Sequence, residues 1–107
     1  MAYEVMLTHD AARDLEDIYT YILLNDTPGK AEHVLTQVEN EINSLNEFPL
    51  RGVYPNELTQ LGIREYREIF YKPYRIIYRV INKKVYIMLI ADGRRNMQTL
   101  LSKRLLL

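Results

Sequence analysis

The sequence lacks cysteine altogether, and it has only two histidines, two serines and no long hydrophobic run. Without cysteine the chain cannot form disulfide bonds or thiolate metal sites, which is typical of proteins from a reducing compartment, so we expect a cytoplasmic location. No apolar run approaches the roughly 20 residues of a membrane-spanning helix, and the N-terminal residues lack the apolar core of a signal peptide. We therefore expect no membrane contact.

The few histidines and serines limit the possible chemistry. His9 and His33 have no spacing typical of metal ligands, and neither Ser44 nor Ser102 lies in a context typical of a hydrolase nucleophile. We therefore expect no metal and no cofactor. At 107 residues the chain is long enough for one domain with its own core, which we expect to span 1–107.

Charge is divided unevenly along the chain, although the formal net charge is zero. Residues 1–60 hold eleven acidic and three basic residues, a balance of −8. Residues 61–107 hold eleven basic and three acidic residues, a balance of +8. The acidic run over residues 14–17 is predicted to be a solvated helix face. The basic half is expected to carry the surface that meets a partner.

Two helices are predicted in the N-terminal half, after a short strand over residues 3–8. Asp10 is expected to cap the first helix, in which apolar residues recur at helical spacing. Thr27 followed by Pro28 is typical of an N-cap and a first turn, and it begins a second amphipathic helix that ends before Phe48. The two helices are predicted to form a hairpin with a single buried side.

The C-terminal half is predicted to form a three-stranded meander, followed by a short helix over residues 96–105. The strands are expected over residues 64–71, 74–81 and 84–91. We predict an α+β fold in which the N-terminal strand and this meander make an antiparallel sheet. The sheet is expected to pack against the helical hairpin.

A two-residue turn at Asn82-Lys83 determines the register expected between the last two strands. In that register the facing pairs are Arg79 with Tyr86, Ile77 with Met88, and Arg75 with Ile90. One sheet face is then apolar and buries against the hairpin, whereas the other face carries the arginines. That arginine face is expected to stay open for a partner.

Seven residues are the candidates for partner contacts. The arginines offer guanidinium groups that bind phosphate or carboxylate in a bidentate way, and the others supply apolar area. The candidates are Arg75, Arg79, Tyr86, Arg94, Arg95, Leu101 and Leu105.

Other interpretations of these side chains stay open. Arg75 and Arg79 could instead pair with Glu65 or Glu68 on the neighbouring strand. Arg64 and Arg67 alternate with those two glutamates, which favours a strand that neutralises itself, and the C-terminal leucines could pack onto the sheet. Gly93 is expected to permit a tight turn that projects Arg94 and Arg95.

Three segments resemble the toxin superfamily of type II toxin–antitoxin systems that includes RelE and ParE. They are Ala11-Ala12-Arg13-Asp14-Leu15-Glu16-Asp17-Ile18-Tyr19, Tyr74-Arg75-Ile76-Ile77-Tyr78-Arg79-Val80 and Ile87-Met88-Leu89-Ile90-Ala91-Asp92-Gly93-Arg94-Arg95. Their order and spacing cover most of the chain, and the predicted order of strand, helical hairpin and meander matches the superfamily fold.

The resemblance implies one of two activities. RelE-like members cleave mRNA on the ribosome with basic residues and, in many, a C-terminal tyrosine or histidine. ParE-like members lack that set and poison DNA gyrase. Here Arg75 matches the strand arginine and Arg95 or Arg94 the one after the last strand, but no tyrosine or histidine follows Tyr86. The resemblance therefore favours a ParE-like gyrase inhibitor that is not an enzyme, with a RelE-like ribonuclease as the alternative.

The resemblance also implies a cognate antitoxin whose flexible C-terminal segment wraps the toxin in a hetero-oligomer. DNA gyrase is the expected target, and sequence-specific nucleic-acid binding is not expected. A non-toxic module that binds an antitoxin-like partner is a third possibility that the sequence leaves open.

Overall fold

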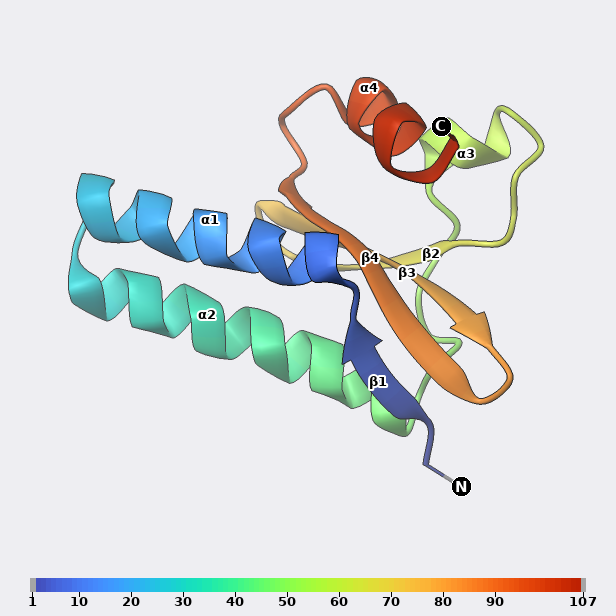
Figure 1. Ribbon diagram of the computed structural model, residues 1–107, viewed down its shortest axis with the longest axis horizontal. Helices are drawn as coiled ribbons and strands as arrows, with labels where there is room; N and C mark the ends of the chain where they lie inside the picture. Colours follow the sequence, from blue (N-terminus) through green and yellow to red (C-terminus); the bar gives the residue numbers. More distant parts are fainter. Residues whose placement is uncertain (1, 107) are drawn as a thin grey trace.

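Figure 1 shows the computed structural model of the chain, which describes residues 2–106. The α+β fold is confirmed: a four-stranded sheet carries a long helical hairpin on one side and short helices on the other. The elements are β1 (Glu4–Leu7), α1 (His9–Asn25), α2 (Pro28–Asn43), a 3-10 turn (Ser44–Asn46), α3 (Asn56–Thr59), β2 (Arg67–Tyr71), β3 (Tyr74–Ile81), β4 (Lys84–Asp92), α4 (Met97–Leu101) and a π-helical turn (Ser102–Leu106).

The strand order across the sheet is β1-β4-β3-β2. The predicted meander is confirmed, because β2, β3 and β4 pair in antiparallel fashion. The first strand differs from the prediction, since β1 runs parallel to β4 and makes the sheet mixed. A parallel pair requires a long crossover connection, and here the helical hairpin together with β2 and β3 provides it.

Helix α1 is capped by Thr8 rather than by Asp10. The Thr8 hydroxyl accepts a hydrogen bond from the Ala11 N–H at 3.1 Å and donates one to the Ile87 carbonyl of β4 at 2.9 Å. One side chain thus caps the helix and ties its start to the sheet. Asp10 lies in the first turn of the helix, where a carboxylate interacts favourably with the positive end of the helix dipole.

The helical hairpin covers one face of the sheet, as predicted. Thr27 caps α2 by accepting a hydrogen bond from the Lys30 N–H at 3.1 Å, and Pro28 occupies the first turn. The apolar stripes of both helices then pack on the sheet and form the larger core. Its fully buried side chains include Ala11, Val38, Leu45, Ile76, Tyr78, Val85 and Ile87.

A β-bulge changes the register between β3 and β4. The turn at Asn82-Lys83 has the expected two residues, both with positive φ (49° and 65°), and Arg79 faces Tyr86 as predicted. Beyond the bulge, however, Ile77 faces Leu89 and Arg75 faces Ala91. The two predicted pairs were wrong because Met88 is an extra residue in β4.

The bulge gives the second sheet face a core of its own. It moves Leu89 to the face of Ile77, and both side chains are buried beneath α3, α4 and the segment before β2. The predicted open arginine face was therefore wrong. The residues of this second core are Leu58, Tyr66, Ile77, Leu89, Ala91, Met97 and Leu101. Within residues 2–106, no helix has the length and apolar character that crossing a bilayer requires.

Candidate functional site

Arg75 lies between two carboxylates. Its Nε donates to Glu68 on β2 at 2.7 Å, and its Nη1 and Nη2 donate to the two oxygens of Glu57 on α3 at 2.8 and 2.7 Å. Only 14% of the Arg75 side chain is exposed. The structure thus places Arg75 inside an ion-pair network, one of the two interpretations that the sequence left open.

The network shifts the proton affinity of all three groups. Hydrogen bonding to Glu57 raises the pKa of Arg75 further above its ordinary value. The same hydrogen bonds lower the pKa of Glu57, which is partly exposed. The pKa of Glu68 is raised instead, because desolvation of this buried carboxyl outweighs the attraction of Arg75.

Gly93 makes room for this network. A Cβ atom at this position would lie 2.8 Å from the Cδ atom of Arg75 and 3.3 Å from the Pro73 carbonyl oxygen. The expected tight turn at Gly93 is present, since the Arg95 N–H donates to the Asp92 carbonyl at 3.1 Å, but among the described glycines only Gly62 has positive φ. The missing side chain at Gly93 therefore serves the close approach of Arg75.

Arg94 and Arg95 lie at one end of the sheet, beside a groove. Arg94 forms a two-pronged ion pair with Asp92 (Nε–Oδ1 3.0 Å, Nη2–Oδ2 2.6 Å), and this contact lowers the pKa of Asp92. Arg95 is exposed and forms no ion pair within residues 2–106. Because Arg94 pairs with Asp92 and Lys30 with Asp26, Lys72 and Arg95 are the cations lining the groove that have no ion pair within residues 2–106.

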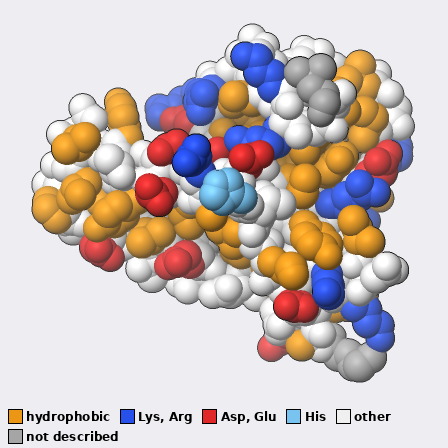
Figure 2. All heavy atoms as spheres, in the orientation of Figure 1, with side chains coloured by type: hydrophobic (Ala, Val, Ile, Leu, Met, Phe, Trp, Pro, Cys, Tyr) orange, Lys and Arg blue, Asp and Glu red, His pale blue; other side chains and the backbone are white. Residues whose placement is uncertain are grey.

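The groove has a volume of about 940 Å³ and lies between the far half of the helical hairpin and the β2–β3 turn. Hydrophobic side chains gather over this part of the hairpin (Figure 2), where Tyr21 and Leu24 are 67% and 77% exposed. The residues that line the groove from the two sides include Ile18, Tyr21, Ile22, Lys30, Val34, Lys72, Pro73, Tyr74, Arg94 and Arg95.

The other predicted contact residues lie apart from this groove. Arg79 and Tyr86 face each other near the opposite end of β3 and β4, and both are half-buried. Leu101 is 1% exposed in the second core, and Leu105 packs against that core. The seven candidates thus fall into separate regions rather than one site.

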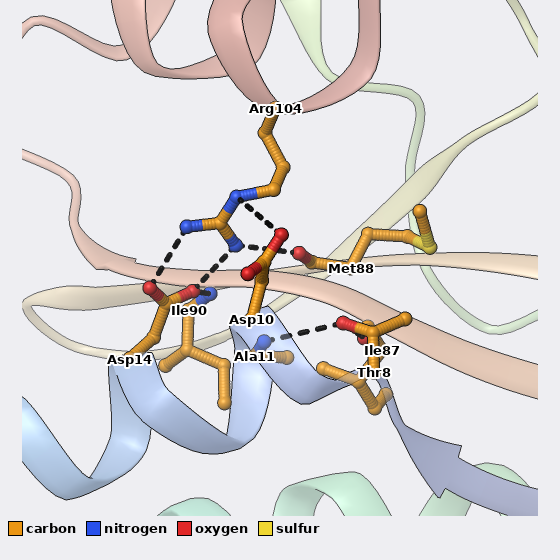
Figure 3. Close-up of polar contacts among 8 residues, drawn as sticks. All are labelled: Thr8, Asp10, Ala11, Asp14, Ile87, Met88, Ile90 and Arg104. Carbon is orange, nitrogen blue, oxygen red and sulfur yellow. Dashed lines mark hydrogen bonds and ion pairs between the residues drawn. The ribbon is translucent and has the colours of Figure 1, made fainter.

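An ion pair that no sequence pattern indicated joins α1 to the C-terminal segment. Arg104 donates to both oxygens of Asp14, Nη1 to Oδ2 at 2.8 Å and Nη2 to Oδ1 at 2.9 Å (Figure 3). Asp14 also accepts the Ile90 N–H at 3.0 Å, and Arg104 donates to the Met88 carbonyl at 2.8 Å. The prediction of a solvated face at Asp14 was therefore wrong.

These contacts satisfy backbone groups of β4 that β1 does not reach. The pairing of β1 stops at Ile87, and Met88 and Ile90 follow it on β4. Since the two side chains are 90 positions apart, no local pattern could have indicated the pair. Hydrogen bonding to Asp14 raises the pKa of Arg104.

Comparison with known proteins identifies the family. The family described as "ParE toxin of type II toxin-antitoxin system, parDE" matches residues 5–97, from β1 to the start of α4. The chain belongs to the ParE toxin family. The predicted superfamily is thereby confirmed, and the protein is a toxin of the type II toxin–antitoxin class.

One sequence relative and two solved structures are similar to the chain. The chain is 28% identical over 100 residues to Toxin ParE3 of Caulobacter vibrioides, covering 94% of this chain and 96% of that protein. The chromosomal ParDE system of P. aeruginosa contains a chain with the same fold, at a TM-score of 0.72 and 22% identity, covering 85% and 96% of the two chains. The RelBE2 toxin–antitoxin complex of Mycobacterium tuberculosis contains another, at a TM-score of 0.60 and 22% identity, covering 86% and 99%.

Proposed function

We propose that this ParE-family toxin binds DNA gyrase, stabilises its cleaved DNA complex and so blocks replication in the cytoplasm. The observation that carries the proposal is the environment of Arg75. This residue matches the strand arginine of the superfamily, yet its guanidinium is already paired with Glu57 and Glu68. An inhibitor that acts by binding needs no free catalytic group there.

The same observation weighs against a ribosome-dependent ribonuclease. Cleavage at a 2′-hydroxyl requires one group to take a proton and another to give one. Arg75 cannot take part, because its pKa is raised further above its ordinary value. No tyrosine or histidine follows Tyr86 in the sequence to supply the missing acid or base.

A cognate antitoxin is the second partner we propose, and the groove beside Arg95 is its binding site. An amphipathic segment could place apolar side chains on Ile18, Ile22 and Val34, and its acidic residues near Lys72 and Arg95. Three of the four acidic side chains that line the groove pair within the chain: Asp14 with Arg104, Asp26 with Lys30 and Asp92 with Arg94. The charge left for a partner is therefore positive on the sheet side of the groove.

The gyrase proposal is tested with purified toxin, gyrase and relaxed plasmid. We expect loss of supercoiling together with accumulation of cleaved DNA, and recovery of supercoiling when the antitoxin is added first. An mRNA-cleavage assay on translating ribosomes runs in parallel. Codon-phased mRNA cuts with unaffected gyrase would contradict the proposal and favour the ribonuclease.

The antitoxin site is tested by charge reversal. Arg95→Glu places a negative charge on the groove wall and is expected to weaken copurification of the coexpressed antitoxin. Arg13→Glu makes the same charge change at an exposed position on α1 that does not line the groove, and it is the matched control. Equal antitoxin binding by both variants would place the antitoxin elsewhere.

A further inference from the structure

Three arginines line a second hollow, at the end of β3 opposite the groove. Arg67 begins β2, Arg79 lies near the end of β3, and Arg64 belongs to the segment before β2. The hollow has a volume of about 260 Å³. Within the described chain none of the three forms an ion pair, whereas four other arginines do. We call these residues the arginine cluster.

Neutral groups hold the arginine cluster in position. The Arg67 Cζ lies 4.6 Å from the centre of the Tyr54 ring, and its guanidinium donates to the Tyr54 hydroxyl at 3.1 Å and to the Gly52 carbonyl at 2.9 Å. The Arg64 Cζ lies 5.4 Å from the same ring. Aromatic faces and carbonyls orient a guanidinium while leaving its positive charge uncompensated.

Arg79 is held in a similar way on the neighbouring strand. Its Cζ lies 5.7 Å from the centre of the Tyr66 ring, which belongs to the second core and is 7% exposed. Tyr66 is therefore a fixed support, and Arg79 is half-buried against it. The cluster thus has side chains with restricted positions rather than three freely moving surface cations.

Glu65 and Glu68, which were expected to neutralise the neighbouring arginines, form no ion pair with the arginine cluster. Glu68 follows Arg67 in the sequence, but its carboxylate accepts a hydrogen bond from Arg75 at 2.7 Å. Glu65 lines the hollow and is exposed, without an ion pair to any described residue. Three positive charges against one negative charge leave an excess of positive charge at the hollow.

We propose that the arginine cluster binds the phosphodiester backbone of a nucleic acid. A planar guanidinium matches phosphate oxygens in a bidentate way, and arginine is the residue of choice for such contacts. An acidic peptide is less suited, because only Leu50 and Val80 offer aliphatic area in the lining. Contacts to phosphate alone are independent of sequence, which agrees with the expectation of no sequence-specific binding.

The site is distinct from the groove proposed for the antitoxin. Tyr74 lines the groove, and Val80 lines the hollow. Six residues of extended strand separate them, or roughly 20 Å at about 3.3 Å per residue. The test below uses the purified toxin with neither gyrase nor antitoxin, so its outcome does not depend on the gyrase proposal.

The experiment measures binding of the purified protein to a short fluorescent DNA duplex of arbitrary sequence at several salt concentrations. Three phosphate contacts predict that the affinity falls about 40-fold between about 50 and about 200 mM salt. Arg79→Gln removes one contact, so the same change in salt should lower its affinity only about 12-fold. Arg13→Gln removes an exposed arginine outside the hollow and should keep the steeper dependence of the wild type.

Arg64→Gln provides a second variant, because Arg64 makes no hydrogen bond within residues 2–106 that the fold would lose. It is expected to reduce the salt dependence as Arg79→Gln does. The same measurement with a single-stranded RNA of similar length identifies the source of the phosphates. The nucleic acid that binds with the higher affinity, DNA or RNA, is the one that the site prefers.

Two results would overturn the proposal. One is equal affinity and equal salt dependence for Arg79→Gln, Arg64→Gln and the Arg13→Gln control, which would place any nucleic acid elsewhere. The other is binding of a polyglutamate peptide that depends on Arg79 while DNA and RNA do not bind, which would make the cluster a site for acidic protein segments.

Discussion

Replacing Arg75 by methionine tests whether the ion-pair network stabilises the fold. The substitution keeps most of the side-chain volume but leaves Glu68, which is 6% exposed, as a buried carboxylate without a partner. Removing one member of a buried ion pair costs about 3–5 kcal/mol. We expect Arg75→Met to lower the free energy of unfolding by that amount in urea titrations near neutral pH.

The pH dependence of this loss is the sharper part of the prediction. Burial raises the pKa of Glu68 in the folded protein, and losing Arg75 raises it further. A carboxyl with a raised folded pKa destabilises the fold fully above that pKa, and the penalty shrinks as the pH falls from that pKa to the ordinary value of 4.5. Arg75 lowers the pKa of Glu57, so the wild type gains stability above the ordinary value of 4.5 and loses it in acid.

Both effects have the same sign for the difference between the two proteins. The Glu68 effect makes the deficit of Arg75→Met shrink as the pH falls from about 7 to about 5, and the Glu57 effect reduces the deficit further only below 4.5. Adding Glu68→Gln to the variant removes the buried charge and should restore about 1–3 kcal/mol. Arg51→Met is the control, because its pair with Glu41 is 36% exposed on each side and is worth at most about 1 kcal/mol. A deficit that stays constant or grows in acid would refute the reasoning.

Three other substitutions test separate features. Tyr78→Phe removes a hydroxyl that donates to the Pro49 carbonyl at 2.7 Å and accepts the Gly52 N–H at 3.0 Å, so urea titrations should show a loss of about 1–3 kcal/mol. Arg104→Met should release the C-terminal segment, seen as faster amide exchange after Met97 with β3 and β4 still protected. Gly93→Ala should displace the side chain of Arg75 and lower the thermal midpoint of unfolding. An unchanged midpoint would argue against close packing of Arg75 on Gly93.

Regular patterns in the sequence predicted most of the fold. Periodic apolar residues located both long helices, Thr27-Pro28 marked the start of α2, and a two-residue turn placed Arg79 opposite Tyr86. These features depend on neighbours within a few positions. The parallel pairing of β1 with β4 depends on contacts about 80 residues apart, so no local pattern indicated it.

The candidate site was harder to predict because of a single residue. Met88 adds one position to β4, and every residue beyond it changes its partner on β3. That shift buries Leu89 and converts the expected open face into a second core. The sequence also does not distinguish an arginine that forms an ion pair, such as Arg75, from one that forms none, such as Arg79. Pairing depends on side chains that only the tertiary fold brings together.

The position of β4 between β1 and β3 affects when the toxin can fold during synthesis. The helical hairpin leaves the ribosome before the meander, because α2 ends at Asn43 whereas β2, β3 and β4 begin only at Arg67, Tyr74 and Lys84. Until β4 has been synthesised, β1 has no strand to pair with, and the Thr8 hydroxyl has no Ile87 carbonyl to which it can donate. The complete four-stranded sheet therefore cannot form until β4 has been synthesised, which ends at residue 92 of 107.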